Sequence, residues 1–152
     1  MEVLGARTID FEKRSLMMKK VYTPIQIVLG IFLGGPFAAI YFLKSNFDIL
    51  GKEDFSKRTL QIGLVFSLVI LVALPFLPDA TPSSVISVLY LIPVILTVQK
   101  YQLTKEEIAN SEEYSFQSSW KVFGMSIVWI LAFVIVSILV TFALETAGIV
   151  SL

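Results

Sequence analysis

Four glutamates, Glu106, Glu107, Glu112 and Glu113, form an acidic cluster in the second half of the chain. Carboxylates at this spacing suit a divalent cation or the basic surface of a partner protein. The simpler interpretation is a solvated helix face with favourable charges near its N-terminus. We therefore expect no metal site and treat the four glutamates as a candidate partner-docking cluster.

A second charged group, Asp48, Glu53 and Asp54 beside Lys52 and Arg58, is the nearest approach to an intramembrane catalytic centre. No calcium loop, P-loop, nucleophile elbow or zinc-protease motif occurs in the sequence. Histidine and cysteine are absent, which removes the usual zinc, haem and copper ligands and the commonest general base. We expect no catalytic residue, no cofactor and no enzymatic activity.

Composition places these residues in a membrane protein. The 152 residues are 56% hydrophobic and 16% charged, and the mean hydropathy is +0.82, whereas soluble domains carry about a quarter charged residues. The net charge of zero disfavours nucleic-acid binding. The predicted fold class is all-α, an integral membrane helical bundle in contact with the lipid bilayer.

Four uncharged apolar stretches are candidates for membrane segments, because a spanning helix needs about 20 apolar residues. We divide the chain into a basic cytoplasmic tail, residues 1–23, and a single transmembrane helical domain, residues 24–152. The four stretches are residues 24–43, 59–77, 84–98 and 122–144.

Polar residues between the stretches predict where helices begin and end. Thr104 and Glu107 have the spacing of a capping box, which predicts a short surface helix near residues 104–113. Thr81 before Pro82 suits the start of the third apolar helix, and Ser118 or Ser119 suits the start of the last.

Lysine and arginine are distributed unevenly between the loops. All twelve lie before residue 24, between residues 44 and 58, or between residues 100 and 121. Cytoplasmic loops collect such cations. Four full spans would divide them between the two faces, whereas a first stretch that enters and leaves by one face would place all of them inside.

The first apolar stretch contains Gly34-Gly35-Pro36 at its middle, a sequence that suits a turn followed by a new helix. Gly51 then suits a left-handed cap at the end of that second helix. The alternative is a spanning helix with a Gly-Pro kink, which membrane proteins tolerate. We leave a re-entrant hairpin and a kinked span as alternatives and favour the hairpin on the cation distribution.

Small residues four apart indicate close approach between helices, where hydrophobic sorting cannot drive association. Intramolecular packing is the simpler interpretation of each pair, and a dimer interface is the alternative. A turn at membrane depth needs cover from protein or water. We expect that covered space to be lined by Gly34, Gly35, Pro36 and Gln61. The candidate helix-packing or turn residues are Gly30, Gly34, Gly35, Pro36, Gly63 and Ser67.

The run Gly34-Gly35-Pro36-x-Ala38-x-x-Tyr41-x-Leu43-Lys44-x-Asn46-Phe47-x-x-Leu50-Gly51 resembles uncharacterised small multi-pass proteins of bacterial inner membranes. The resemblance covers less than a fifth of the chain and implies location only. It implies a bacterial inner, or plasma, membrane protein and supplies no activity.

The sequence contains small-residue packing motifs and no recognisable set of catalytic residues. This combination favours a non-enzymatic membrane protein that associates with a membrane-protein partner or with itself. An accessory subunit, an assembly factor and an immunity protein all fit this description. A homo-oligomeric channel or passive transporter subunit is the alternative. We expect the N-terminus to be cytoplasmic.

Overall fold

The computed structural model describes residues 18–78 and 80–149. The protein is 78% helical, and four of the described helices are long and apolar enough to cross a membrane. The predicted all-α helical bundle is therefore confirmed. In chain order the elements are β1 (Lys19–Val21), α2 (Pro24–Ile49), α3 (Glu53–Ala73), η1 (Leu74–Phe76), α4 (Ser83–Tyr101), α5 (Lys105–Ala109), β2 (Tyr114–Phe116) and α6 (Ser119–Thr146).

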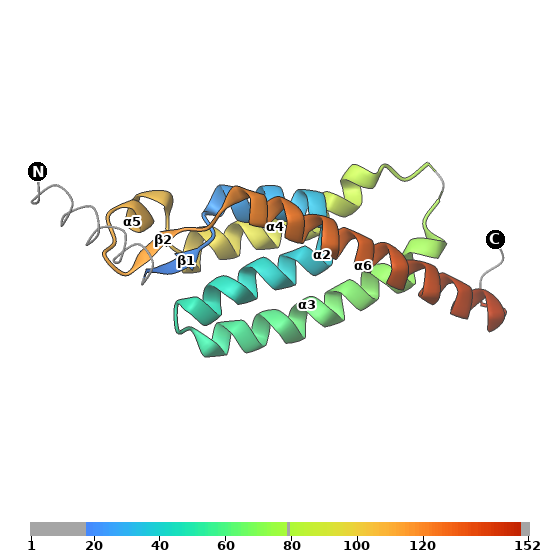
Figure 1. Cartoon of the computed structure of the whole chain (residues 1–152). Helices are drawn as coiled ribbons and strands as arrows, with labels where there is room; N and C mark the ends of the chain where they lie inside the picture. The colour runs from blue at the N-terminus through green and yellow to red at the C-terminus, as the bar shows by residue number, and fades with distance from the viewer. Residues whose placement is uncertain (1–17, 79, 150–152) are drawn as a thin grey trace, which may run out of the picture.

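Helix α2 is a hairpin of two arms, residues 24–34 and 36–49, that run in opposite directions (Figure 1). The backbone reverses at Gly35, whose φ of 71° and ψ of −163° are not helical. Asn46 and Tyr22, 24 residues apart, are joined by a hydrogen bond of 2.8 Å. As one continuous helix, these residues would lie about 36 Å apart. The first apolar stretch therefore folds back on itself, and a single continuous helix with a kink is excluded.

The α2 hairpin occupies the centre of the bundle, and α3, α4 and α6 each pack against it (Figure 1). Its buried side chains include Ile27, Ile31, Phe42 and Phe47, all with 0% exposure. By contrast, most side chains of α3, α4 and α6 face outward. The buried core lies along the hairpin, and the surrounding helices present apolar surface to the exterior, as expected for a protein in lipid.

Residues near the start of the chain pair with residues 95 positions later. β1 and β2 form a two-stranded parallel sheet in which Lys19 is opposite Tyr114 and Val21 is opposite Phe116. Neither strand was predicted, because three-residue strands carry no recognisable periodicity. The sheet holds the start of α2 beside the start of α6, at the end of the bundle where α5 also lies (Figure 1).

The predicted capping box of α5 is confirmed, since Thr104 and Glu107 each accept a hydrogen bond from the other residue's backbone N–H. The helix ends at Ala109, earlier than the predicted residue 113. The Ser111 hydroxyl accepts hydrogen bonds from the backbone N–H groups of Glu113 and Tyr114. This turn redirects the chain into β2.

The other predicted helix boundaries agree with the structure to different degrees. Gly51 has a φ of 68° after the end of α2, as predicted for a left-handed cap. Pro82, rather than Thr81, is at the N-cap position of α4. Ser118 is at the N-cap position of α6 but makes no capping hydrogen bond with its side chain. The helices also extend beyond the uncharged stretches, because charged residues at their ends remain helical.

Candidate functional site

Gly30 and Gly34 of the hairpin lie where a side chain would collide with its neighbours. A Cβ atom on Gly30 would be 2.5 Å from the ring of Phe42, and one on Gly34 would be 3.0 Å from the backbone of Ser126. The Ser126 hydroxyl donates at 2.9 Å to the carbonyl oxygen of Gly30. α6 therefore lies directly against the first arm of the hairpin. Close approach of this kind is the packing mode that small residues permit in membranes.

The turn of the hairpin is covered by the protein itself. Gly35 and Pro36 are buried, and the nearest side-chain atom to a Cβ on Gly35 would belong to Ile130 of α6, at 3.6 Å. Gln61 is exposed on α3, where it lines a shallow depression that none of the turn residues borders. Gln61 and the turn thus do not line one vestibule. α6 covers the two glycines of the turn, as a turn at membrane depth requires, and Pro36 lines a separate groove between α3 and α4.

Gly63 and Ser67 form the contact surface of α3. A Cβ on Gly63 would lie 2.5 Å from the Ile40 side chain, so α3 approaches the second hairpin arm closely. Ser67 is 2% exposed, and its hydroxyl has no hydrogen-bond partner among the residues that the structure describes. All six candidate packing or turn residues are thus buried or half-buried in contacts within one chain.

The four glutamates of the acidic cluster do not act as one group. Glu107 caps α5, and hydrogen bonds from Thr104 hold the pKa of its carboxyl below the ordinary value. Glu113 forms an ion pair of 2.8 Å with Lys19, which lowers the pKa of Glu113. Glu106 and Glu112 are exposed. Within residues 18–78 and 80–149, no three metal-ligating side chains gather.

The second charged group is also divided among local contacts. Asp48 is 2.6 Å from the Lys44 ammonium, and it accepts a hydrogen bond from the Ser56 hydroxyl. Lys52 donates at 2.5 Å to the carbonyl oxygen of Tyr101. These contacts tie the ends of α2, α3 and α4 together. They give Asp48 and Lys52 structural roles, whereas Arg58 of the same group lines a groove between α3 and α4.

A buried amide cluster, which the sequence analysis missed, holds the hairpin closed. The Asn46 side chain accepts from the Tyr22 N–H and donates to the Tyr22 carbonyl oxygen, both at 2.8 Å. It also donates at 2.9 Å to Oε1 of Gln102. Asn46 is 2% exposed and Gln102 is 7% exposed. The only sequence signal was Asn46 itself, a polar residue inside a hydrophobic helical pattern.

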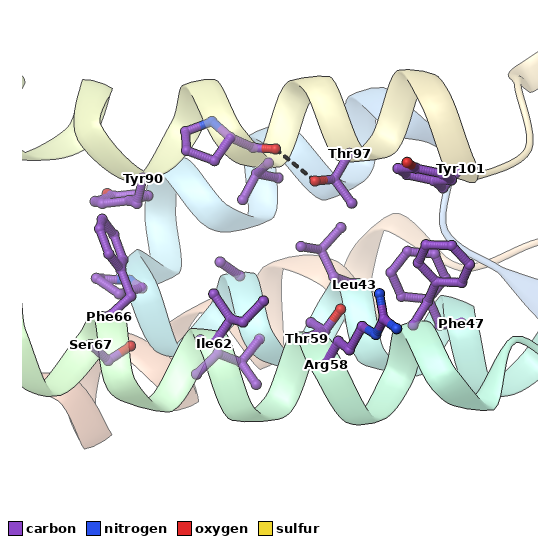
Figure 2. A pocket seen from close by; sticks show the side chains of 17 residues that line it. Leu43, Phe47, Arg58, Thr59, Ile62, Phe66, Ser67, Tyr90, Thr97 and Tyr101 are labelled. Carbon is purple, nitrogen blue, oxygen red and sulfur yellow. Dashed lines mark hydrogen bonds between the residues drawn. The ribbon is translucent and has the colours of Figure 1, made fainter.

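A groove runs between α3 and α4 with the second hairpin arm as its floor (Figure 2). It has a volume of about 370 Å³, within the usual range for small-molecule sites. Leu43, Ile62 and Phe66 are representative of its apolar lining, and Arg58 points into it from α3. Sequence reasoning did not find this groove, because it depends on how the hairpin separates two helices.

The cations of the described residues gather at the same end of the bundle, where α2 and α4 end and α3, α5 and α6 begin (Figure 1). The opposite end, formed by η1, the loop before α4 and the end of α6, carries no lysine or arginine among the described residues. The fold therefore has one cationic end and one end without cations. No family model, curated protein or solved structure matches the chain.

Proposed function

We infer that the protein is a non-enzymatic, multi-pass membrane protein that acts by associating, within the bilayer, with another membrane protein or a second copy of itself. The observation that carries this proposal is the outer face of α6. This helix has 28 residues and a length of about 42 Å, more than the roughly 30 Å of the hydrocarbon core. Only Val122 and Ser126 of its residues are buried.

The exposed face of α6 has the spacing of a helix-pairing surface. From Gly124 onward, exposed residues follow at alternating intervals of four and three, the pattern that keeps one seam facing a partner helix. Their side chains are 54–67% exposed. After Gly124 the residues are Val128, Leu131, Ile135, Ile138 and Phe142.

Gly124 distinguishes this seam from a surface adapted only to lipid. It is exposed, and no atom of residues 18–78 or 80–149 lies within 4 Å of where its Cβ would be. A glycine inside a helix costs about 1 kcal/mol relative to alanine, and no contact in the described part of the chain uses the space that Gly124 leaves. A second helix crossing at Gly124 would use that space.

The orientation we propose follows the positive-inside rule, with the cationic end and the N-terminus in the cytoplasm of a bacterial cell and the bundle in its inner membrane. The fold-back of α2 supports this orientation, because it brings β1 and the start of α3 to the same end of the bundle. Three helices, α3, α4 and α6, then remain as full crossings.

A channel receives less support from the described residues. The hydroxyls of Thr97 and Thr146 donate to backbone carbonyl oxygens of their own helices, and the Ser126 hydroxyl lies within hydrogen-bond distance of the carbonyl oxygens of Val122 and Gly30. Such hydroxyls are satisfied locally and do not form a polar path across the bundle. No second function is therefore proposed.

Association through α6 is tested by placing a large side chain at Gly124. Two differently tagged copies are expressed together, solubilised in mild detergent, and captured through one tag; stoichiometric membrane-protein partners are identified in the same eluate. Gly124→Leu should abolish the association that wild type shows, while the monomer retains its unfolding temperature, since the position is open. Association unchanged in Gly124→Leu, or no association by wild type with itself or a stoichiometric partner, would contradict the proposal.

A further inference from the structure

The groove between α3 and α4 is open along its length, and no part of α6 lines it. Its floor is the second arm of the hairpin, where Ala39 and Leu43 are each 7% exposed. One wall comes from α3 and the other from α4, which face each other across the space (Figure 2). In a membrane this trough would be filled by an apolar chain, because an empty cavity forfeits dispersion contacts with its lining.

One end of the groove carries a positive charge. The Arg58 side chain extends from α3 toward α4, beside Phe47 and Thr59 (Figure 2). Among the ion pairs of the described residues none involves Arg58, although Asp54 lies one helical turn before it. Arg58 is thus a guanidinium at the rim of an apolar trough, free to make the paired hydrogen bonds that phosphate accepts.

Aromatic rings close the groove beyond Arg58. The ring of Phe55 lies 5.5 Å from that of Phe47 and 4.7 Å from that of Tyr101. These three residues come from α3, α2 and α4 respectively, so the stack spans the trough from wall to wall. A chain in the groove must therefore leave it sideways at Arg58, at the cationic end of the bundle.

The length of the groove matches one leaflet of a bilayer. Beyond the aromatic stack at Phe55, its lining on α3 continues from Arg58 to Ser67, nine positions that correspond to about 14 Å along a helix. Half of the hydrocarbon thickness is about 15 Å. An acyl chain that begins at Arg58 would end near Ser67 and Tyr90, at the middle of the membrane.

We propose that this groove binds one anionic phospholipid of the leaflet at the cationic end. One acyl chain lies between α3 and α4, and the phosphate accepts hydrogen bonds from Arg58. Arg58, the one cation among the residues that line the groove, sets the headgroup end, and the apolar lining sets the position of the chain. The site is independent of association through α6, since the two surfaces share no residue.

Lipid retention tests the proposal. The protein is placed in nanodiscs containing equal amounts of phosphatidylglycerol and phosphatidylcholine with the same acyl chains, and lipids retained after release are counted by native mass spectrometry. Wild type should retain one phosphatidylglycerol in preference to phosphatidylcholine. Arg58→Gln should lower that retention about fivefold or more, the loss expected for one cation near an anionic headgroup.

Lys57 provides a matched control, because it is the neighbouring cation and pairs at 3.5 Å with Glu53 rather than lining the groove. Lys57→Gln should change retention less than twofold. Thr97→Trp fills the groove without changing its charge and should lower retention as Arg58→Gln does.

Three results would overturn the proposal. Equal losses in Arg58→Gln and Lys57→Gln would mean that general surface charge attracts the lipid. Equal retention of the two lipids by wild type would mean that the site does not prefer phosphatidylglycerol to phosphatidylcholine. Full retention by a folded Thr97→Trp variant would mean that the lipid, or a partner helix, lies outside the groove.

Discussion

Replacing Asn46 with leucine tests the closed hairpin with a change of known direction. The substitution keeps a similar branched shape and removes the hydrogen bonds of the Asn46 side chain to Tyr22 and Gln102. Tyr22 is 1% exposed, so its backbone N–H and carbonyl oxygen would lose their partners in a buried place. Each buried group left unsatisfied costs about 1–3 kcal/mol, so we expect Asn46→Leu to lower the free energy of unfolding by roughly 2–5 kcal/mol.

Whether Asn46→Leu lowers or raises the free energy of unfolding distinguishes the hairpin from a single spanning helix. In a continuous helix, Asn46 would be about 36 Å from Tyr22, and leucine would be at least as favourable as asparagine in an apolar segment. Unfolding is measured by titration with a denaturing detergent from a mild-detergent solution. A variant as stable as wild type, or more stable, would refute the reasoning.

The second asparagine of the chain supplies the control for this experiment. Asn110 is exposed after the end of α5. Asn110→Leu should change the free energy of unfolding by no more than about 0.5 kcal/mol, as surface substitutions usually do. A large loss in both variants would show that the assay responds to leucine on the surface rather than to the buried amide cluster.

Three further predictions concern insertion in the membrane, helix packing and the acidic cluster. The protein should remain in the membrane fraction through alkaline carbonate extraction, because α3 and α6 are apolar and long enough to span the bilayer; recovery in the supernatant would contradict membrane insertion. Gly34→Leu should lower the yield of folded protein in detergent, whereas Gly124→Leu should not, since only Gly34 faces a backbone at 3.0 Å; equal yields would mean that α6 does not pack there. Changing Glu106 and Glu112 together to glutamine should leave unfolding unchanged; if they dock a basic partner, its capture should fall and depend on salt, and full capture would exclude docking.

The membrane fold was predictable because its signals are strong and local. Long uncharged stretches, the Thr104–Glu107 capping box and Gly51 each identify one element from a few neighbouring residues. The Gly34-Gly35-Pro36 sequence marked the place of the reversal. The distribution of cations favoured the hairpin over the kinked span, since that rule adds information from loops far apart in the chain.

The contacts between distant segments were not predictable. Strand β1 pairs with a strand 95 positions away, and neither has a sequence pattern of its own. Asn46 and Gln102 meet across 56 residues. The role of Arg58 depends on the groove, which exists only because the hairpin holds α3 apart from α4. Sequence patterns indicate which face of a helix is apolar, but they do not indicate which other helix packs against that face.

The fold-back of α2 is tested most directly by labelling single cysteines from either side of the membrane, and the absence of cysteine from the chain keeps the experiment clean. Lys20 precedes α2 and Lys57 follows it, and both are exposed. Lys20→Cys and Lys57→Cys should be labelled only from the cytoplasmic side, whereas Ala80→Cys should be labelled only from the outside. Labelling of Lys20→Cys and Lys57→Cys from opposite sides would show that α2 crosses the membrane and would contradict the hairpin.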